Sequence, residues 1–416
     1  MPDQRLDRRF EQERRALLDR IHMPEIAEIR VRARAVRRRR HTLAAGVAAV
    51  CVGMLGTVAA VVDRTGSPQT QVAASPSPTL QGWRGGGLTV LALTAQVLDL
   101  PGDLYDIQFA DRRTGYALSR ACVNGDRCEL GFARTTDGGA TWSSDVGPPV
   151  ATVAREAVPQ LVTVADSGVV FVTGDQSWFL ATRSTAWLPS PGPRNNPTIS
   201  VLPPDGRLWR PQAQSGRCSI GPVEAWLPDG ARRRLANQPA MEVCGVAPAR
   251  TGDGAWWVGG RITTVDGTVA AVGVTRDNGR TWTVTPLPDA TGYAQVSTLG
   301  SEVYAAVVTP VTPEQLVEVR AMFRSVNRSP FRPYGRSLGA ISGDVVPLLD
   351  GRLVAAGGGW LVAAGRDAPL TPAGGSLPWV GRLARTPGFW VSYDLFRNGW
   401  AAVSVDGEVW QKINLR

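Results

Sequence analysis

The stretch Thr135-Thr136-Asp137-Gly138-Gly139-Ala140-Thr141-Trp142 occurs a second time, with changes, as Thr275-Arg276-Asp277-Asn278-Gly279-Arg280-Thr281-Trp282. Both copies fit the pattern Ser/Thr-x-Asp-x-Gly-x-Thr-Trp. Such residues form a tight turn: the Asp accepts bonds from turn amides, the Gly tolerates positive φ, and the Trp covers the turn with apolar area. The sequence therefore predicts a β-hairpin at each copy and a structural, non-catalytic role for Asp137 and Asp277.

Two weaker copies lie near the C-terminus. Ser404-Val405-Asp406-Gly407-Glu408-Val409-Trp410 keeps the Asp, the Gly and the Trp, whereas Ser325-Val326-Asn327-Arg328-Ser329 is more degenerate. A calcium loop is not predicted at any copy, because the alternating carboxylates that such a loop requires are missing. The residues with a predicted structural role in these turns are Thr135, Asp137, Gly139, Thr141, Trp142, Thr275, Asp277, Gly279, Thr281, Trp282, Ser404, Asp406 and Trp410.

The repeated pattern resembles the Asp-box, also called the bacterial neuraminidase repeat. In that family the box joins two outer strands of a blade, and most members are β-propellers. The segment Leu104–Ala117, LYDIQFADRRTGYA, is similar to a blade start in the photosystem II assembly-factor-like repeat families. The resemblance therefore implies an all-β propeller.

Short strands are indicated throughout residues 88–416. Apolar or alternating runs such as GVVFVTG, GAWWVGG and GFWVSYD alternate with turns rich in Gly, Pro, Asp and Asn. Seven blades would take about 47 residues each, within the range expected for propeller repeats, and six blades is the alternative. The predicted blades begin near residues 104, 160, 198, 248, 293, 342 and 379. Residues 312–323 fit either one or two helical turns or a loop leading into a strand.

An apolar segment lies near the N-terminus. Thr42–Val62 contains no charged residue and as a helix would span about 31 Å, the thickness of a hydrocarbon core. Because Arg37–Arg40 come directly before it, the positive-inside rule places the N-terminus in the cytoplasm. A cleaved signal peptide is the alternative, although its charged start would be shorter than 41 residues. The prediction is a membrane-anchored chain with four parts: a basic, helical cytoplasmic tail (1–41), a transmembrane helix (42–62), a Pro/Ser/Gly-rich linker (63–87) and an extracytoplasmic propeller (88–416).

The positive charge is concentrated in the tail. Of the net charge of +9, about two thirds belongs to residues 1–41, and the rest of the chain is close to neutral. A nucleic-acid partner is therefore not predicted, since that function needs a basic face on the folded domain. The tail is expected to contact anionic lipid headgroups of the bilayer, and a cytoplasmic protein partner for it is the alternative.

Four of the five cysteines follow the apolar segment, namely Cys122, Cys128, Cys218 and Cys244. An even number beyond a membrane helix predicts disulfides in an oxidising compartment. Three pairings are open, and the two local ones, 122 with 128 and 218 with 244, are preferred. A zinc site is not predicted, because the spacings are not Cys-x-x-Cys and both histidines precede the apolar segment. No metal and no cofactor are predicted.

Two functions compete. One is a non-catalytic module that binds an unknown extracytoplasmic protein or glycan, and the other is an exo-sialidase-type glycoside hydrolase. The sialidase resemblance would require three arginines that grip a carboxylate, a Tyr nucleophile with a Glu partner, and an Asp acid. The nearest arginine motif, Arg261-Ile262-Thr263, lies in mid-domain and lacks the Pro that normally follows, and Leu88–Phe109 contains no arginine. The sequence assigns no catalytic residue, and the binding module is favoured.

Overall fold

The computed structural model divides the chain into two compact units, Met1–Ser75 and Pro76–Arg416, and all described residues belong to the second. The described residues are 82–92, 100–122, 125–145, 147–164, 168–174, 176–182, 184–190, 198–210, 218, 221–265, 267–310, 316–334, 339–357, 359–366, 368–378, 380–386, 389–393 and 400–414. The predicted tail, the predicted transmembrane helix and residues 63–81 of the predicted linker lie outside these ranges. Within them, no helix has both the length and the apolar character needed to cross a membrane.

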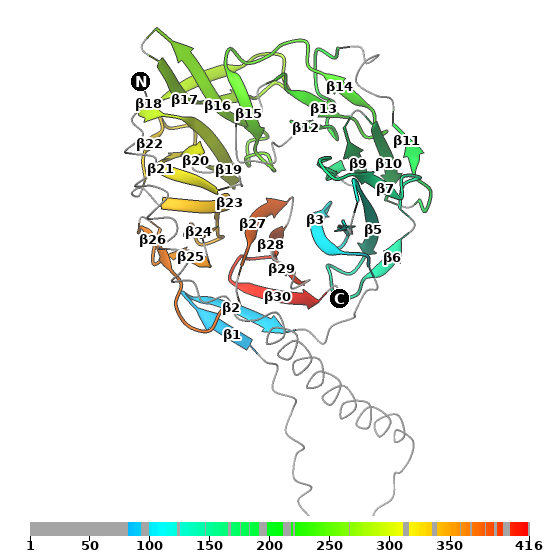
Figure 1. Cartoon of the computed structure of the whole chain (residues 1–416). Helices are drawn as coiled ribbons and strands as arrows, with labels where there is room; N and C mark the ends of the chain where they lie inside the picture. The colour runs from blue at the N-terminus through cyan, green and yellow to red at the C-terminus, as the bar shows by residue number, and fades with distance from the viewer. Residues whose placement is uncertain are drawn as a thin grey trace, which may run out of the picture. The chain divides into compact units, whose positions relative to one another are not determined.

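The strands form consecutive antiparallel groups arranged around a ring (Figure 1). Blade 1 comprises β3 (Asp103–Phe109), β4 (Gly115–Ala121), β5 (Arg127–Thr135), β6 (Ser143–Asp145) and β7 (Thr152–Ala154), and blade 2 comprises β8 (Gln160–Val164), β9 (Gly168–Thr173), β10 (Gln176–Ala181) and β11 (Leu188–Pro189). Blade 3 comprises β12 (Arg207–Trp209), β13 (Glu224–Trp226) and β14 (Arg232–Arg234), and blade 4 comprises β15 (Glu242–Val246), β16 (Trp256–Thr264), β17 (Gly267–Thr275) and β18 (Thr283–Thr291).

The remaining groups are blades 5 to 7. Blade 5 comprises β19 (Tyr293–Leu299), β20 (Glu302–Pro310), β21 (Leu316–Val326) and β22 (Arg332–Pro333), and blade 6 comprises β23 (Gly339–Pro347), β24 (Leu353–Ala356), β25 (Trp360–Ala363) and β26 (Leu370–Pro372). Blade 7 comprises β27 (Arg382–Thr386), β28 (Phe389–Tyr393), β29 (Trp400–Ser404) and β30 (Val409–Asn414). The fold is a seven-bladed β-propeller. The prediction of seven blades is confirmed, and the alternative of six is wrong.

The long strand β21 covers most of a segment whose sequence was ambiguous. Leu316–Val326 pairs with β20 along its length, and its first residues also pair with β23. The helical interpretation of residues 316–323 is therefore wrong. Its alternation of buried Val317 and Val319 with the more exposed Glu318 and Arg320 follows the period of two that a strand requires.

Two N-terminal strands complete blade 7. β2 (Leu88–Ala92) pairs in parallel with β30, with Thr89 opposite Val409, and β1 (Gly82–Gly85) pairs antiparallel with β2 on the outside. The linker predicted to extend to residue 87 therefore ends before Gly82. Gly86 and Gly87 form the turn of this hairpin. A Cβ on Gly85, the last residue of β1, would lie 2.1 Å from the carbonyl oxygen of Gly374.

The core of the propeller lies between its blades. Each hydrophobic cluster of the described residues combines side chains from two neighbouring blades, and the clusters cover all seven junctions of the ring. At the closure, Phe109 of blade 1 stacks on Phe389 of blade 7 with ring centroids 4.2 Å apart. The adjacent residues Trp256 and Trp257 pack against blades 3 and 5 respectively, because successive side chains of a strand point to opposite faces. This two-sided burial explains why many strands are apolar at consecutive positions.

Both predicted disulfides are present. Cys122–Cys128 joins the residue that follows β4 to strand β5, with the two Cα atoms 4.2 Å apart. Cys218–Cys244 joins the connection between β12 and β13 of blade 3 to strand β15 of blade 4, with a Cα separation of 4.6 Å. The local pairing preferred from the sequence is confirmed, and the second bond links two neighbouring blades.

Candidate functional site

All four copies of the repeated turn lie on one face of the propeller. They connect the third and fourth strands of blades 1, 4, 5 and 7, that is β5 to β6, β17 to β18, β21 to β22 and β29 to β30. In an antiparallel meander of four strands, the turn between strands one and two lies at the same end as the turn between strands three and four. We call this end of the propeller the turn face.

In the three copies of the turn that keep the Asp, its carboxylate accepts hydrogen bonds from groups of the same turn. Asp137 accepts bonds from the Thr135 hydroxyl (2.8 Å), the Thr141 amide (2.8 Å) and the Thr141 hydroxyl (2.5 Å). Asp277 has the same three partners in its copy, at 2.8, 2.9 and 2.6 Å. Asp406 accepts from Ser404 and from the amides of Glu408 and Val409. These geometries are those of turn-forming residues.

The pKa of Asp277 carries a testable consequence. Its hydrogen bonds, led by that from the Thr281 hydroxyl, lower the pKa to about 2 from an ordinary 3.8. A carboxyl whose pKa is lower in the folded state stabilises the fold above its unfolded pKa and loses that contribution as pH falls. We expect the melting temperature of the Asp277→Asn variant to fall less steeply than that of wild type between pH 4 and pH 2. Parallel melting curves of the two proteins across this range would contradict this.

The fourth copy, Ser325–Ser329, is built differently. It contains no carboxylate, and its tip residues Asn327 and Arg328 both have positive φ, 50° and 68°. The Ser325 hydroxyl donates to the carbonyl of Ser329 (2.5 Å), and the Asn327 amide donates to the carbonyl of Ser301 (3.1 Å). An Arg in this left-handed conformation costs about 1 kcal/mol or more relative to the Gly that such a turn prefers.

The strained turn places its arginine on a carboxylate of the neighbouring blade. Arg328 Nε lies 3.0 Å from Asp253 Oδ2, and Arg276 Nε of the second repeat lies 3.6 Å from the same oxygen. Asp253 Oδ1 accepts from the Thr251 hydroxyl (2.6 Å). The Thr251 hydroxyl, the Ala255 amide and the Arg328 guanidinium hold the pKa of Asp253 below its usual value against the opposing effect of burial. The cluster thus has one ionised carboxylate between two guanidinium groups.

A small cavity of about 140 Å³ opens beside this cluster, at the junction of blades 4 and 5. Trp257 lines it as a buried aromatic surface, held by a bond from its indole N–H to the Thr251 hydroxyl (3.2 Å) and overlaid by Arg276. Arg328 reaches the cavity from blade 5 and is 62% exposed at its side chain. We call this the junction pocket, defined by its lining residues Thr251, Asp253, Trp257, Ser301, Val303, Asn327 and Arg328.

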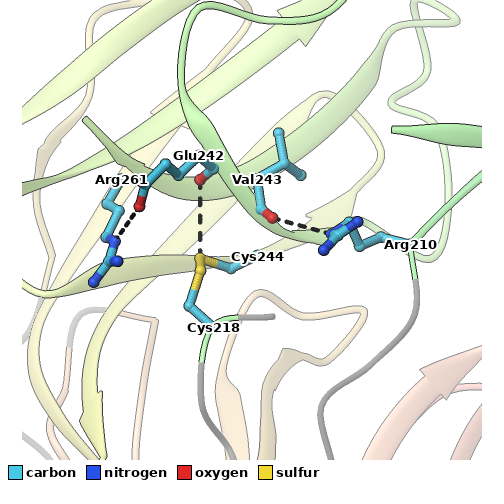
Figure 2. The surroundings of a disulfide bond; sticks show 6 residues. All are labelled: Arg210, Cys218, Glu242, Val243, Cys244 and Arg261. Carbon is cyan, nitrogen blue, oxygen red and sulfur yellow. Dashed lines mark hydrogen bonds and ion pairs between the residues drawn. A yellow bond between two sulfur atoms is a disulfide. The ribbon is translucent and has the colours of Figure 1, made fainter. Parts of the chain in front are cut away.

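The disulfide Cys218–Cys244 lies in a second polar region. Figure 2 shows Arg261 and Arg210 on opposite sides of the disulfide. Arg261 Nε binds Glu242 Oε2 at 2.5 Å, and Arg210 Nε donates to the carbonyl of Val243 at 3.2 Å. The nearest sequence match to a sialidase arginine, Arg261, is therefore already paired with a carboxylate.

A tyrosine–glutamate pair occurs between blades 5 and 6. The Tyr304 hydroxyl donates to Glu302, which also binds Arg324 (2.7 Å) and Arg366 (2.8 Å). A nucleophilic phenol needs a lowered pKa or a base that can remove its proton. Tyr304 is 1% exposed, and burial, with the neighbouring Glu302, raises its pKa far above the ordinary value. This arrangement keeps the phenol protonated and suits a structural hydrogen bond.

The sequence identified the turns but not the junction pocket. Its residues come from three separate stretches of blades 4 and 5, and only Asn327 and Arg328 lie in a segment that the repeat pattern singled out. One local signal was present: a hairpin tip of the Asn-Gly type is expected where the chain has Asn-Arg. The partner of that arginine, Asp253, follows no pattern that spacing reveals.

No family model matches the chain, and no curated protein matches it. Solved structures that it resembles include YCF48 bound to D1 peptide, with 16% identity over 77% of this chain and 85% of that chain and a TM-score of 0.33. They also include the GH74 xyloglucanase from Xanthomonas campestris (14%, 74% and 60%, TM-score 0.39) and the WD40 β-propeller domain of Doa1 (9%, 78% and 95%, TM-score 0.37). Nothing about function follows from likenesses at this level.

Proposed function

We propose that the chain is a non-catalytic binding module: an Asp-box β-propeller held at the outer face of a membrane by the helix predicted at Thr42–Val62. The observation that carries the binding function is the junction pocket. There a turn that has Asn327 in place of the usual Asp directs its next residue, Arg328, at a carboxylate of the neighbouring blade. A purely structural turn would keep the residues that its three relatives keep. The oxidised cysteines of the propeller support a location outside the cytoplasm.

The bonding of the polar groups disfavours the sialidase alternative. Asp137, Asp277 and Asp406 are engaged by their own turns, and Arg261 is neutralised by Glu242. The Tyr304–Glu302 pair, which has the residue types of a sialidase nucleophile and its partner, is buried with a raised pKa. A carboxylate substrate would need an excess of cationic groups around it. The cluster at the junction pocket has two arginines on one carboxylate, and the residues that line the pocket include no Tyr, Ser–His or Cys nucleophile.

The test measures binding and turnover with the full chain purified in detergent, and topology with reporter fusions in living cells. We expect it to enrich a defined set of sequences from a phage-displayed random peptide library and to release no product from a fluorogenic sialoside. A reporter that is active only outside the membrane should work when fused after Arg416 and fail when fused before Met1. Sialoside turnover that is lost in Arg261→Ala would replace the binding module with the hydrolase, and the reverse reporter pattern would overturn the proposed location.

A further inference from the structure

From the junction pocket we infer that the binding partner presents a carboxylate, the side chain of Asp or Glu in a protein segment that docks on the turn face. This inference rests on the proposed function and names the chemistry that its site recognises. It is carried by the charge balance, the geometry of the two arginines and the strain at Arg328.

The charge balance of the Asp253 cluster, whose third member Arg276 does not itself line the pocket, favours an anion. Arg276 and Arg328 share the single carboxylate of Asp253, so the cluster keeps one excess positive charge. In the described part of the chain, Asp253 is the one carboxylate that either guanidinium contacts. The hydrogen bonds that lower the pKa of Asp253 keep it ionised at neutral pH, so it holds both arginines in place.

The geometry leaves the binding edge of each arginine available. Both arginines approach Asp253 through Nε. A guanidinium is a planar fork that binds carboxylates in pairs of parallel hydrogen bonds, and its two terminal nitrogens form one such edge. The cavity of about 140 Å³ beside the fork holds several times the volume of a water molecule, about 30 Å³. A carboxylate with one or two methylenes fits there, and Trp257 offers apolar surface to the methylenes.

The backbone strain argues that Arg328 is kept for its side chain. Residues with unfavourable φ persist where the surrounding structure forces them, and they cluster at binding sites. A Gly at position 328 would relieve the strain and preserve the turn, because Gly138 and Gly407 occupy the same position at positive φ in two of the other copies. The chain instead carries a long cationic side chain that is mostly exposed at the pocket.

The experiment measures fluorescence anisotropy of two labelled twelve-residue peptides on the full chain in detergent. One peptide carries four Glu in a Gly/Ser background, and the other carries Gln at the same positions. Arg328→Gly is the test variant, since it removes the guanidinium while relieving the strain. Arg320→Ala is the matched control, because it removes a similarly exposed arginine from β21, the strand that leads into the turn of Arg328, outside the pocket.

We expect the Glu peptide to bind wild type and Arg320→Ala within twofold of each other, and to bind Arg328→Gly at least tenfold more weakly. The melting temperature of Arg328→Gly should stay within about 3 °C of wild type, and the Gln peptide should bind none of the three. Equal binding of the Gln peptide, full binding to Arg328→Gly, or an equal loss in Arg320→Ala would each overturn the inference. Absence of Glu-peptide binding would also overturn it, while the phage selection would still decide the proposed function.

Discussion

Replacing Trp410 with Ala should lower the free energy of unfolding by about 3–5 kcal/mol, the usual cost of removing a large buried aromatic side chain. Trp410 is fully buried where β30, β2 and blade 6 meet. Its ring contacts Trp360 edge-on with centroids 5.0 Å apart, and its indole N–H donates to the Gly407 carbonyl at 2.8 Å. Truncation would leave a cavity at the junction of blades 6 and 7.

The matched control is Trp282→Ala at the corresponding position of the second repeat. Trp282 is only partly buried, although the repeat pattern places it at the same position as the buried Trp142 of the other full copy. Trp142, at 2% exposure, should behave like Trp410. Urea unfolding of the full chain in detergent, followed by far-ultraviolet circular dichroism, gives the comparison. Equal destabilisation by Trp410→Ala and Trp282→Ala would show that burial does not set the ranking.

A double substitution in β2, Leu88→Asp with Val90→Asp, should prevent the propeller from closing. Leu88 and Val90 are 1% and 0% exposed and pack between blades 6 and 7. Each change removes about 1.5–3 kcal/mol of apolar burial and adds the cost of an unpaired buried carboxylate. The sum approaches the total stability of an ordinary domain, about 5–15 kcal/mol. We therefore expect loss of the cooperative melting transition in calorimetry.

Thr89→Asp is the control for this pair, because its side chain points to the other side of the same strand and is partly exposed. It should leave the transition nearly unchanged. If the double variant yields no soluble protein, Leu88→Ala provides a milder test, with an expected loss of about 2–5 kcal/mol. A double variant that melts together with wild type would show that β2 is not needed for closure.

The parts of the fold that the sequence predicted are those encoded locally. The repeated turns need only the residues between Thr135 and Trp142, or Thr275 and Trp282, whose side chains bond one another. The cysteine pairs are likewise near neighbours in the chain or in adjacent blades. Blade starts could be read because strands of similar length recur between Gly- and Asp-rich turns.

The parts that the sequence did not predict depend on distant segments. The pairing of β2 with β30 joins the two ends of the propeller, and no local pattern distinguishes Leu88–Ala92 from the first strand of an ordinary blade. The junction pocket depends on how blade 4 packs on blade 5, which sets the distance between Arg328 and Asp253. A repeat pattern predicts the hydrogen bonds within a turn, but it does not predict the contacts that the turn makes with a neighbouring blade.

The parallel pairing of β2 with β30 also fixes the order of events during synthesis. Ala92 leaves the ribosome 322 residues before Asn414, an interval of roughly 15–60 s at about 5–20 residues per second. For that time β2 has one open edge and an apolar face formed by Leu88 and Val90, a combination that invites pairing with other chains. β2 cannot pair until β30 has been synthesised. The speed of elongation and the supply of chaperones will therefore govern how much of this protein reaches its closed form.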